Sequence, residues 1–237
     1  MVRLLVVFAV VLLGAACGRP PGGAMKDHTQ SAVRLVSTFV VLLLLMAPSM
    51  GAQELTGSAL VGALKQGGYV IVMRHAQSPR EAPDDRTANS DNTTRERQLD
   101  EAGRAGAAAM GNAIRALAIP IGATLSSPTY RAMETVRLAR LPTPQRVDEL
   151  GDRGRSMQGV TDEDGAWLRQ RVTQFPAGTN TILVTHLPNI TRAFPQYSTG
   201  VDDGDALVLG PDGKGGATLV GRVEIADWPW LQSSAKQ

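Results

Sequence analysis

The chain has 237 residues, of which 43% are hydrophobic and 19% are charged, values that suit one folded domain with a sizeable core. Its formal charge is +2, but residues 1–52 contribute four basic residues and one acidic residue, so the remainder is near neutral. A near-neutral domain argues against nucleic acid as a partner and against a membrane surface bound through bulk charge. The single cysteine is Cys17, so residues 53–237 offer no cysteine nucleophile, no cysteine ligand for zinc or iron–sulfur, and no disulfide framework.

The N-terminal segment contains two apolar stretches, Leu4–Ala16 and Phe39–Ala47, and each is preceded by a basic residue. A membrane-spanning helix needs about 20 apolar residues, and both stretches are shorter. A basic residue followed by a short apolar core is typical of a secretory signal peptide. The segment therefore indicates export.

Two signals in tandem are not needed for one export event. We therefore expect translation to start at Met25, with residues 1–24 an over-extended start and residues 25–52 a signal peptide that is removed. The folded domain is then residues 53–237, located in the periplasm and without a stable membrane span in its mature form. Two alternatives stay open: a lipid anchor at Cys17, and retention by an uncleaved leader.

After the leader, helical and strand-like segments alternate. The runs at 69–73 and 181–185 are mostly apolar and rich in β-branched residues, which is typical of buried strands. Asp100, Ser127 and Thr161 each precede a helical pattern and are expected as N-caps. In chain order we expect helices over 55–66, 100–117, 127–139, 161–172 and from 188, and strands over 69–73, 123–125, 145–148, 181–185, 206–210 and 217–225. This alternation predicts an α/β domain.

Two of the three histidines close the strand-like runs. His75 ends the first run, directly after Arg74, and His186 ends the second. In an open α/β sheet the carboxyl ends of strands form the crevice where ligands bind, so we expect the two imidazoles to meet there. A histidine at a strand end is often only structural, and two histidines with a carboxylate are common zinc ligands. Because Arg74 would repel a metal cation, we favour an anionic substrate and expect no metal and no other cofactor.

The two histidines form part of a set of three motifs. Arg74-His75 follows the first strand, the segment Ser126–Thr135 reads Ser-Ser-Pro-Thr-Tyr-Arg-Ala-Met-Glu-Thr, and His186 follows a later apolar strand. Leu99–Gly103 adds a Leu-Asp-Glu-Ala-Gly helix opening. In this order and spacing, the sequence resembles the histidine phosphatase superfamily over roughly residues 55–230. The resemblance implies a phosphoglycerate mutase-like fold, a three-layer sandwich with a mostly parallel sheet flanked by helices.

The resemblance also implies an activity and a small-molecule phosphomonoester substrate. His75 is the expected nucleophile that forms a phosphohistidine intermediate, for which it must be neutral. Arg74 and Arg131 each offer forked N–H groups to phosphate oxygens, and His186, if protonated, adds a further cation. We expect a phosphomonoester hydrolase of the exported branch, acting on a small or envelope-associated substrate. The alternatives are a mutase-type phosphoryl transferase and a catalytically silent anion-binding module.

An alkoxide leaving group needs a proton, which the family supplies from a carboxyl group after the third strand. Val147-x-Glu149 resembles the family's Leu-x-Glu pattern, so we choose Glu149 as the general acid, with Asp148 and Asp152 as alternatives. The family's glycine follows its acid by four positions, whereas Gly154 follows Glu149 by five.

Residues 77–98 are polar and begin just after His75, which predicts a long loop over the pocket. We expect its arginines to form a solvated face, with the alternative that one of them contacts the substrate beyond its phosphate; these are Arg80, Arg86, Arg95 and Arg97. A second group of charges, Asp202, Asp203 and Asp205, is expected to belong to a connecting loop rather than to the site.

Overall fold

The structure, a computed structural model, describes residues 54–153 and 156–234. The predictions for the leader, including Met25, Cys17 and the cleavage site, lie outside the described residues. Within them, no helix combines the length and the apolar character that a membrane crossing requires.

A six-stranded sheet forms the centre of the domain, with the strand order β3-β2-β4-β1-β5-β6. Its first four strands run parallel, whereas β5 is antiparallel to β1 and β6 is antiparallel to β5. The strands are β1 (Val70–Arg74), β2 (Ile121–Ser126), β3 (Gln145–Arg146), β4 (Asn180–Thr185), β5 (Ala206–Pro211) and β6 (Ala217–Val223). The central strands β1 and β4 are buried along almost their whole length, because helices cover both faces of the sheet.

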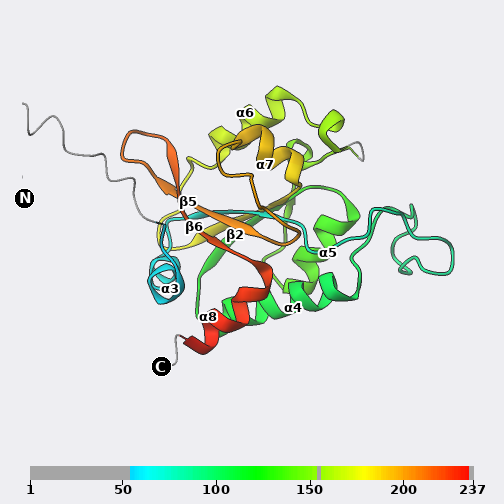
Figure 1. The fold of residues 1–237 in the computed structure, drawn as a ribbon, viewed down its shortest axis with the longest axis horizontal. Helices are drawn as coiled ribbons and strands as arrows, with labels where there is room; N and C mark the ends of the chain where they lie inside the picture. Colours follow the sequence, from blue (N-terminus) through cyan, green and yellow to red (C-terminus); the bar gives the residue numbers. More distant parts are fainter. Residues whose placement is uncertain (1–53, 154–155, 235–237) are drawn as a thin grey trace, which may run out of the picture. The chain divides into compact units, whose positions relative to one another are not determined.

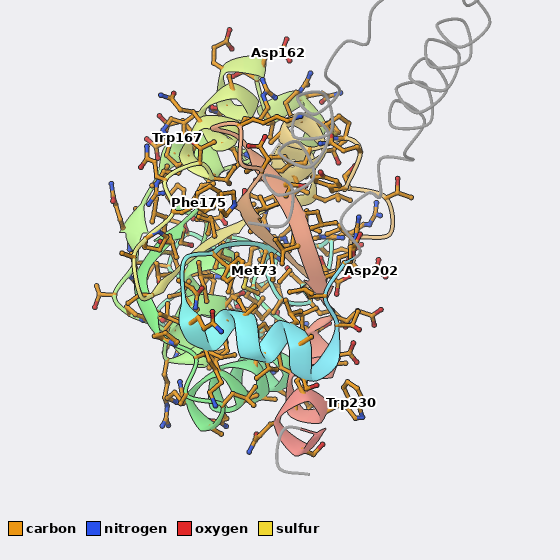
Figure 2. All side chains as sticks on the ribbon, turned by 90° about the vertical axis from the view of Figure 1, so that its left-hand side faces the viewer. Met73, Asp162, Trp167, Phe175, Asp202 and Trp230 are labelled. Carbon is orange, nitrogen blue, oxygen red and sulfur yellow. The ribbon has the colours of Figure 1, made fainter. Side chains whose placement is uncertain are left out.

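The helices form one layer on each face of this sheet (Figure 1). They are α3 (Gly57–Gln66), α4 (Glu101–Ala116), α5 (Tyr130–Ala139), α6 (Asp162–Arg171), α7 (Leu187–Ala193) and α8 (Trp228–Ser234). Alternate residues of β1 point to opposite faces. Ile71 and Met73 belong to the core that packs against α3, α4, α5 and α8, and Val70 and Val72 belong to the core against α6 and α7. Figure 2 shows Met73 inside the domain, while Trp230 points away from α8. The domain is therefore the predicted three-layer α/β sandwich.

Most predicted elements are present, with differences at their ends. The predicted strand 145–148 stops at Arg146, because the next residues turn into the 3₁₀ helix η1 (Asp148–Leu150). Two further 3₁₀ helices, η2 (Ser156–Gly159) and η3 (Ile225–Asp227), and helix α8 were not predicted. Ser127 is not the N-cap of α5: the cap is Thr129, and the Ser127 hydroxyl instead lies 2.9 Å from the ring of His186.

Residues 77–98 contain turns but no helix or strand, as predicted. The two ends of this loop are tied together, since Arg97 donates to the backbone carbonyls of Ser78 and Pro79 and Ser78 donates to the carbonyl of Gln98. Near its middle, Asn89 donates to Glu134 of α5. The loop is therefore held against the domain although it has no regular structure of its own.

Candidate active site

The register of the sheet brings the two predicted histidines together. Strands β1 and β4 are neighbours, with Arg74 opposite Thr185, and the backbone N–H of His75 continues the ladder by donating to the Thr185 carbonyl at 3.0 Å. His75 and His186 follow directly, and their ring centroids lie 5.1 Å apart. Both side chains are almost completely buried. The prediction that they meet at the carboxyl edge of the sheet is confirmed.

His75 is oriented by its own backbone. Its Nδ1 lies 2.8 Å from the carbonyl oxygen of Ala76, and because a carbonyl only accepts, Nδ1 carries the proton. The lone pair is therefore on Nε2, which accepts from Nε of Arg131 at 3.1 Å. Burial holds the pKa of His75 well below its usual value, and the charges of His186, Arg131 and Arg74 lower it further. The result is a neutral imidazole with a defined nucleophilic atom.

Arg131 connects the members of the site. It stands in the first turn of α5, and its side chain is 4% exposed. Besides its bond to His75, it donates from Nη2 to Asp152 at 2.6 Å and to Nδ1 of His186 at 3.0 Å. One guanidinium thus contacts both imidazoles and a carboxylate, as a forked, permanently charged donor can.

His186 was predicted to add a cation if it is protonated, and its hydrogen bonds in this structure fit the neutral imidazole. Its Nδ1 accepts from Arg131, so Nε2 carries the proton and donates to Ser127 Oγ. Burial and the nearby guanidinium groups of Arg131, Arg97 and Arg74 hold the pKa of His186 well below its usual value. These three arginines are far from His186 in the sequence, so their distances from its ring could not be predicted before the fold was known.

Arg74 extends from the end of β1 to a loop on the opposite side of the pocket. Its Nη2 lies 2.6 Å from Asp203 Oδ1, and its Nη1 donates to the carbonyl of Val201 at 3.2 Å. Asp203 was expected to be a loop residue outside the site, yet its carboxylate lines the pocket beside His75. No local pattern in the sequence indicates this contact, because it depends on the pairing of β1 with β5.

This arrangement can be compared with known proteins. Residues 70–163 match the model of the histidine phosphatase superfamily (branch 1). Over this segment the chain is similar to that superfamily. Its fold is similar to that of the protein histidine phosphatase SixA solved with tungstate, with 19% identity over 67% of this chain and 98% of that chain and a TM-score of 0.50. A phosphoserine phosphatase from Entamoeba histolytica is 10% identical over 66% of this chain and 97% of its own, with a TM-score of 0.44. No curated protein matches the sequence.

Three carboxyl groups follow β3 and were the candidates for the general acid. Of the three candidates, only Asp152 lies in the pocket, 4% exposed and 3.8 Å from Nδ1 of His186. Glu149, our choice from sequence, is half-buried in η1 and does not line the pocket, and Asp148 is exposed. The reason is local: Leu150 is buried and ends the 3₁₀ turn, after which extended backbone at Gly151 brings Asp152 to the site.

The pocket that both histidines line is a cavity of about 580 Å³, within the usual size range of small-molecule sites. Arg80 and Arg97 of the long loop line this pocket, which supports the alternative that a loop arginine contacts the substrate. Arg86 and Arg95 are exposed and pair with neighbouring aspartates. The lining residues are Arg74, His75, Ser78, Arg80, Arg97, Arg131, Asp152, Met157, His186, Leu187, Pro188, Thr191 and Asp203. With both histidines neutral, four arginines face two aspartates, so the lining carries an excess of two positive charges, which matches a phosphomonoester dianion.

Metal ligation is a separate question. Among the residues that the structure describes, no group of three or more histidine, cysteine, aspartate or glutamate side chains is placed to hold a metal ion.

Proposed function

We propose that the chain is a phosphomonoester hydrolase that acts through a phosphohistidine at His75. The observation that carries this proposal is the orientation of His75: its Nδ1 proton is held by the Ala76 carbonyl, and the nucleophilic Nε2 faces the guanidinium of Arg131. A neutral nucleophile beside fixed cations is what attack on a phosphoryl dianion requires.

In the first step, the phosphoryl oxygens are bound by Arg74 and Arg131, whose N–H groups also stabilise the charge of the transition state. The Nε2 lone pair forms a bond to phosphorus while the bond from phosphorus to the leaving oxygen breaks. Asp152 then protonates the leaving alkoxide, the role that we assigned to Glu149 from sequence.

In the second step, water attacks phosphorus, Asp152 accepts its proton, and His75 leaves as the neutral imidazole. His186 has a supporting role in both steps. The arriving dianion offsets the guanidinium charges that hold the pKa of His186 down, so His186 takes up a proton together with the substrate. In this way the predicted pocket cation forms when substrate binds.

The test is trapping of the intermediate. Wild-type protein incubated with ³²P-labelled substrate should acquire an acid-labile, base-stable adduct, and His75→Ala should form no adduct and hydrolyse no p-nitrophenyl phosphate. Circular dichroism should show that the variant is folded. The proposal fails if His75→Ala keeps full activity, or if chelation of metal ions removes the activity of the wild type.

Hydrolysis and mutase-type transfer differ in the acceptor of the phosphoryl group. Mutases resemble the chain less well, because they carry a longer insertion between the acid and the second histidine than the stretch from Asp152 to His186. A turnover assay with a sugar acid present distinguishes the two: release of inorganic phosphate supports hydrolysis, and a phosphorylated sugar acid supports the mutase. Binding of phosphate without any turnover would support the catalytically silent anion-binding module.

We further propose that the protein is exported to the periplasm and acts on a small or envelope-associated phosphorylated substrate. The apolar stretches of the leader, each after a basic residue, support export. N-terminal sequencing of the exported protein tests this proposal, since a mature chain that begins at Cys17 would indicate a lipid anchor instead. A panel of phosphorylated sugars, lipids, nucleotides and phosphohistidine peptides would narrow the substrate class.

A further inference from the structure

Asp203 stands at the tip of a rigid turn. The turn is closed by the backbone bond from Asp205 N to the Asp202 carbonyl at 3.2 Å, and the Asp205 carboxylate accepts from Asp202 N at 2.9 Å. Gly204 has a φ of +88°, and a Cβ at that position would lie 2.6 Å from Ile225 Cδ1. Only glycine suits this site, so the local backbone sets the direction of the Asp203 side chain.

The turn is also joined to the strand that carries the site. The backbone N–H of Arg74 donates to the Asp205 carbonyl at 3.0 Å, next to the antiparallel pairing of β1 with β5. Both terminal nitrogens of the Arg74 side chain face the same segment, one toward Asp203 and the other toward Val201. The backbone N–H of Ser78, at the start of the long loop, also interacts with the Asp203 carboxylate.

We propose that Asp203 is a positioning residue, whose carboxylate fixes the Arg74 guanidinium so that its remaining N–H groups face the phosphoryl group. A guanidinium has five N–H donors in a rigid plane. One is engaged by the Val201 carbonyl, and the ion pair with Asp203 holds the other terminal nitrogen, so further N–H groups remain for phosphate oxygens. Fixing the plane in advance removes the rotamer freedom that a long side chain would otherwise lose when substrate binds. This inference rests on the proposed function of the pocket but assigns a residue that the catalytic steps do not use.

Three variants separate position from charge. Asp203→Ala removes the acceptor and the charge, Asp203→Asn keeps an acceptor and removes the charge, and Asp202→Asn removes the same charge from the exposed neighbour in the turn, which Figure 2 labels at the edge of the domain. Because a misplacement of about 1 Å near the reacting group can cost up to about 100-fold in rate, we expect Asp203→Ala to lower kcat/KM about 30-fold. The kcat/KM of Asp203→Asn should stay within about threefold of the wild-type value, and the kcat/KM of Asp202→Asn should equal the wild-type value.

Calorimetric titration with inorganic phosphate gives a second readout that does not require turnover. Asp203→Ala should weaken phosphate binding about tenfold, as expected when one charged donor is misplaced. In an Arg74→Gln background, Asp203→Ala should lower kcat/KM less than about twofold further, because residues that act through one contact are not additive.

Three outcomes would overturn the inference. Tighter phosphate binding by Asp203→Ala would show that Asp203 competes with phosphate for Arg74. A further 30-fold loss in the Arg74→Gln background would show that Asp203 acts through another group. A lower melting temperature with unchanged kcat/KM would show a purely structural role. If the wild type binds phosphate without turning over any substrate, the proposed function fails, and the positioning role is still decided by phosphate binding.

Discussion

The pocket contains two arginine–aspartate pairs that have the same contact distance but different surroundings. Arg131 and Asp152 lie 2.6 Å apart with side chains 4% and 6% exposed, and Arg74 and Asp203 lie 2.6 Å apart with side chains 23% and 21% exposed. A buried charge needs its partner, because water cannot replace it, whereas the partly exposed side chains of Arg74 and Asp203 keep some contact with water and salt. Burial rather than distance therefore decides what each pair contributes: the first to the stability and the chemistry of the site, the second to its geometry.

The sharpest contrast is between the two arginines. Arg131→Gln removes a donor that contacts both histidines and breaks the buried ion pair between Arg131 and Asp152, so kcat should fall about 1,000-fold and unfolding in urea should become easier by about 3 kcal/mol. Arg74→Gln should lower kcat about 100-fold and the free energy of unfolding by less than about 1 kcal/mol. Equal losses of stability in the two variants would contradict the comparison.

The two carboxylates should differ in their response to the leaving group. If Asp152 protonates the leaving oxygen, Asp152→Asn should lower kcat about 100-fold for an alkyl phosphate but less than about tenfold for p-nitrophenyl phosphate, whose leaving group needs little protonation. Asp203→Asn should affect the two substrates equally, and Glu149→Gln should affect neither. A selective loss on the alkyl phosphate in Glu149→Gln would restore our original choice of acid.

Arg97 lines the pocket. Burial lowers the pKa of its guanidinium, as does the charge of Arg131, while the carboxylates of Asp203 and Asp152 oppose this. Arg97→Gln removes one of the two excess positive charges, so KM for a dianionic substrate should rise about tenfold. Arg86→Gln, in the same loop but with its side chain 90% exposed, is the matched control and should leave KM unchanged. Equal KM values in the two variants would show that the loop does not contribute charge to the site.

His75 and His186 should make the free energy of unfolding depend on pH. Their folded pKa values are lowered, so the folded state binds fewer protons than the unfolded state below the unfolded value of about 6.5. Stability is therefore complete above that pH and falls as the pH decreases toward the folded pKa values, by up to about 1.4 kcal/mol per pH unit for each histidine. Urea unfolding between pH 8 and pH 5 measures the slope, and a slope in His75→Gln equal to that of the wild type would contradict this account.

The sequence predicted well those features that depend on local pattern. Buried strands, the capping box at Thr161 and the positions of His75, Arg131 and His186 follow from periodicity and from short motifs, and each is present in the structure. The pairing of β1 with β5, which places Asp203 against Arg74, joins residues more than 120 positions apart and has no local sign. The prediction of Glu149 failed to place a carboxyl group in the pocket for a local reason: the 3₁₀ turn at Asp148–Leu150, which the strand pattern did not show, brings Asp152 there instead.

The hydrogen bond from His75 N to the Thr185 carbonyl makes His75, the proposed nucleophile, part of the β-ladder rather than of a loop. The spacing of the two imidazoles is thus set by backbone that every fold of this topology must form. The loop of residues 77–98, by contrast, lies outside the sheet and lines the same cavity. Replacing this loop in directed evolution should therefore change which phosphomonoesters are accepted while the chemical step is retained, which makes the loop the rational target for engineering new selectivity.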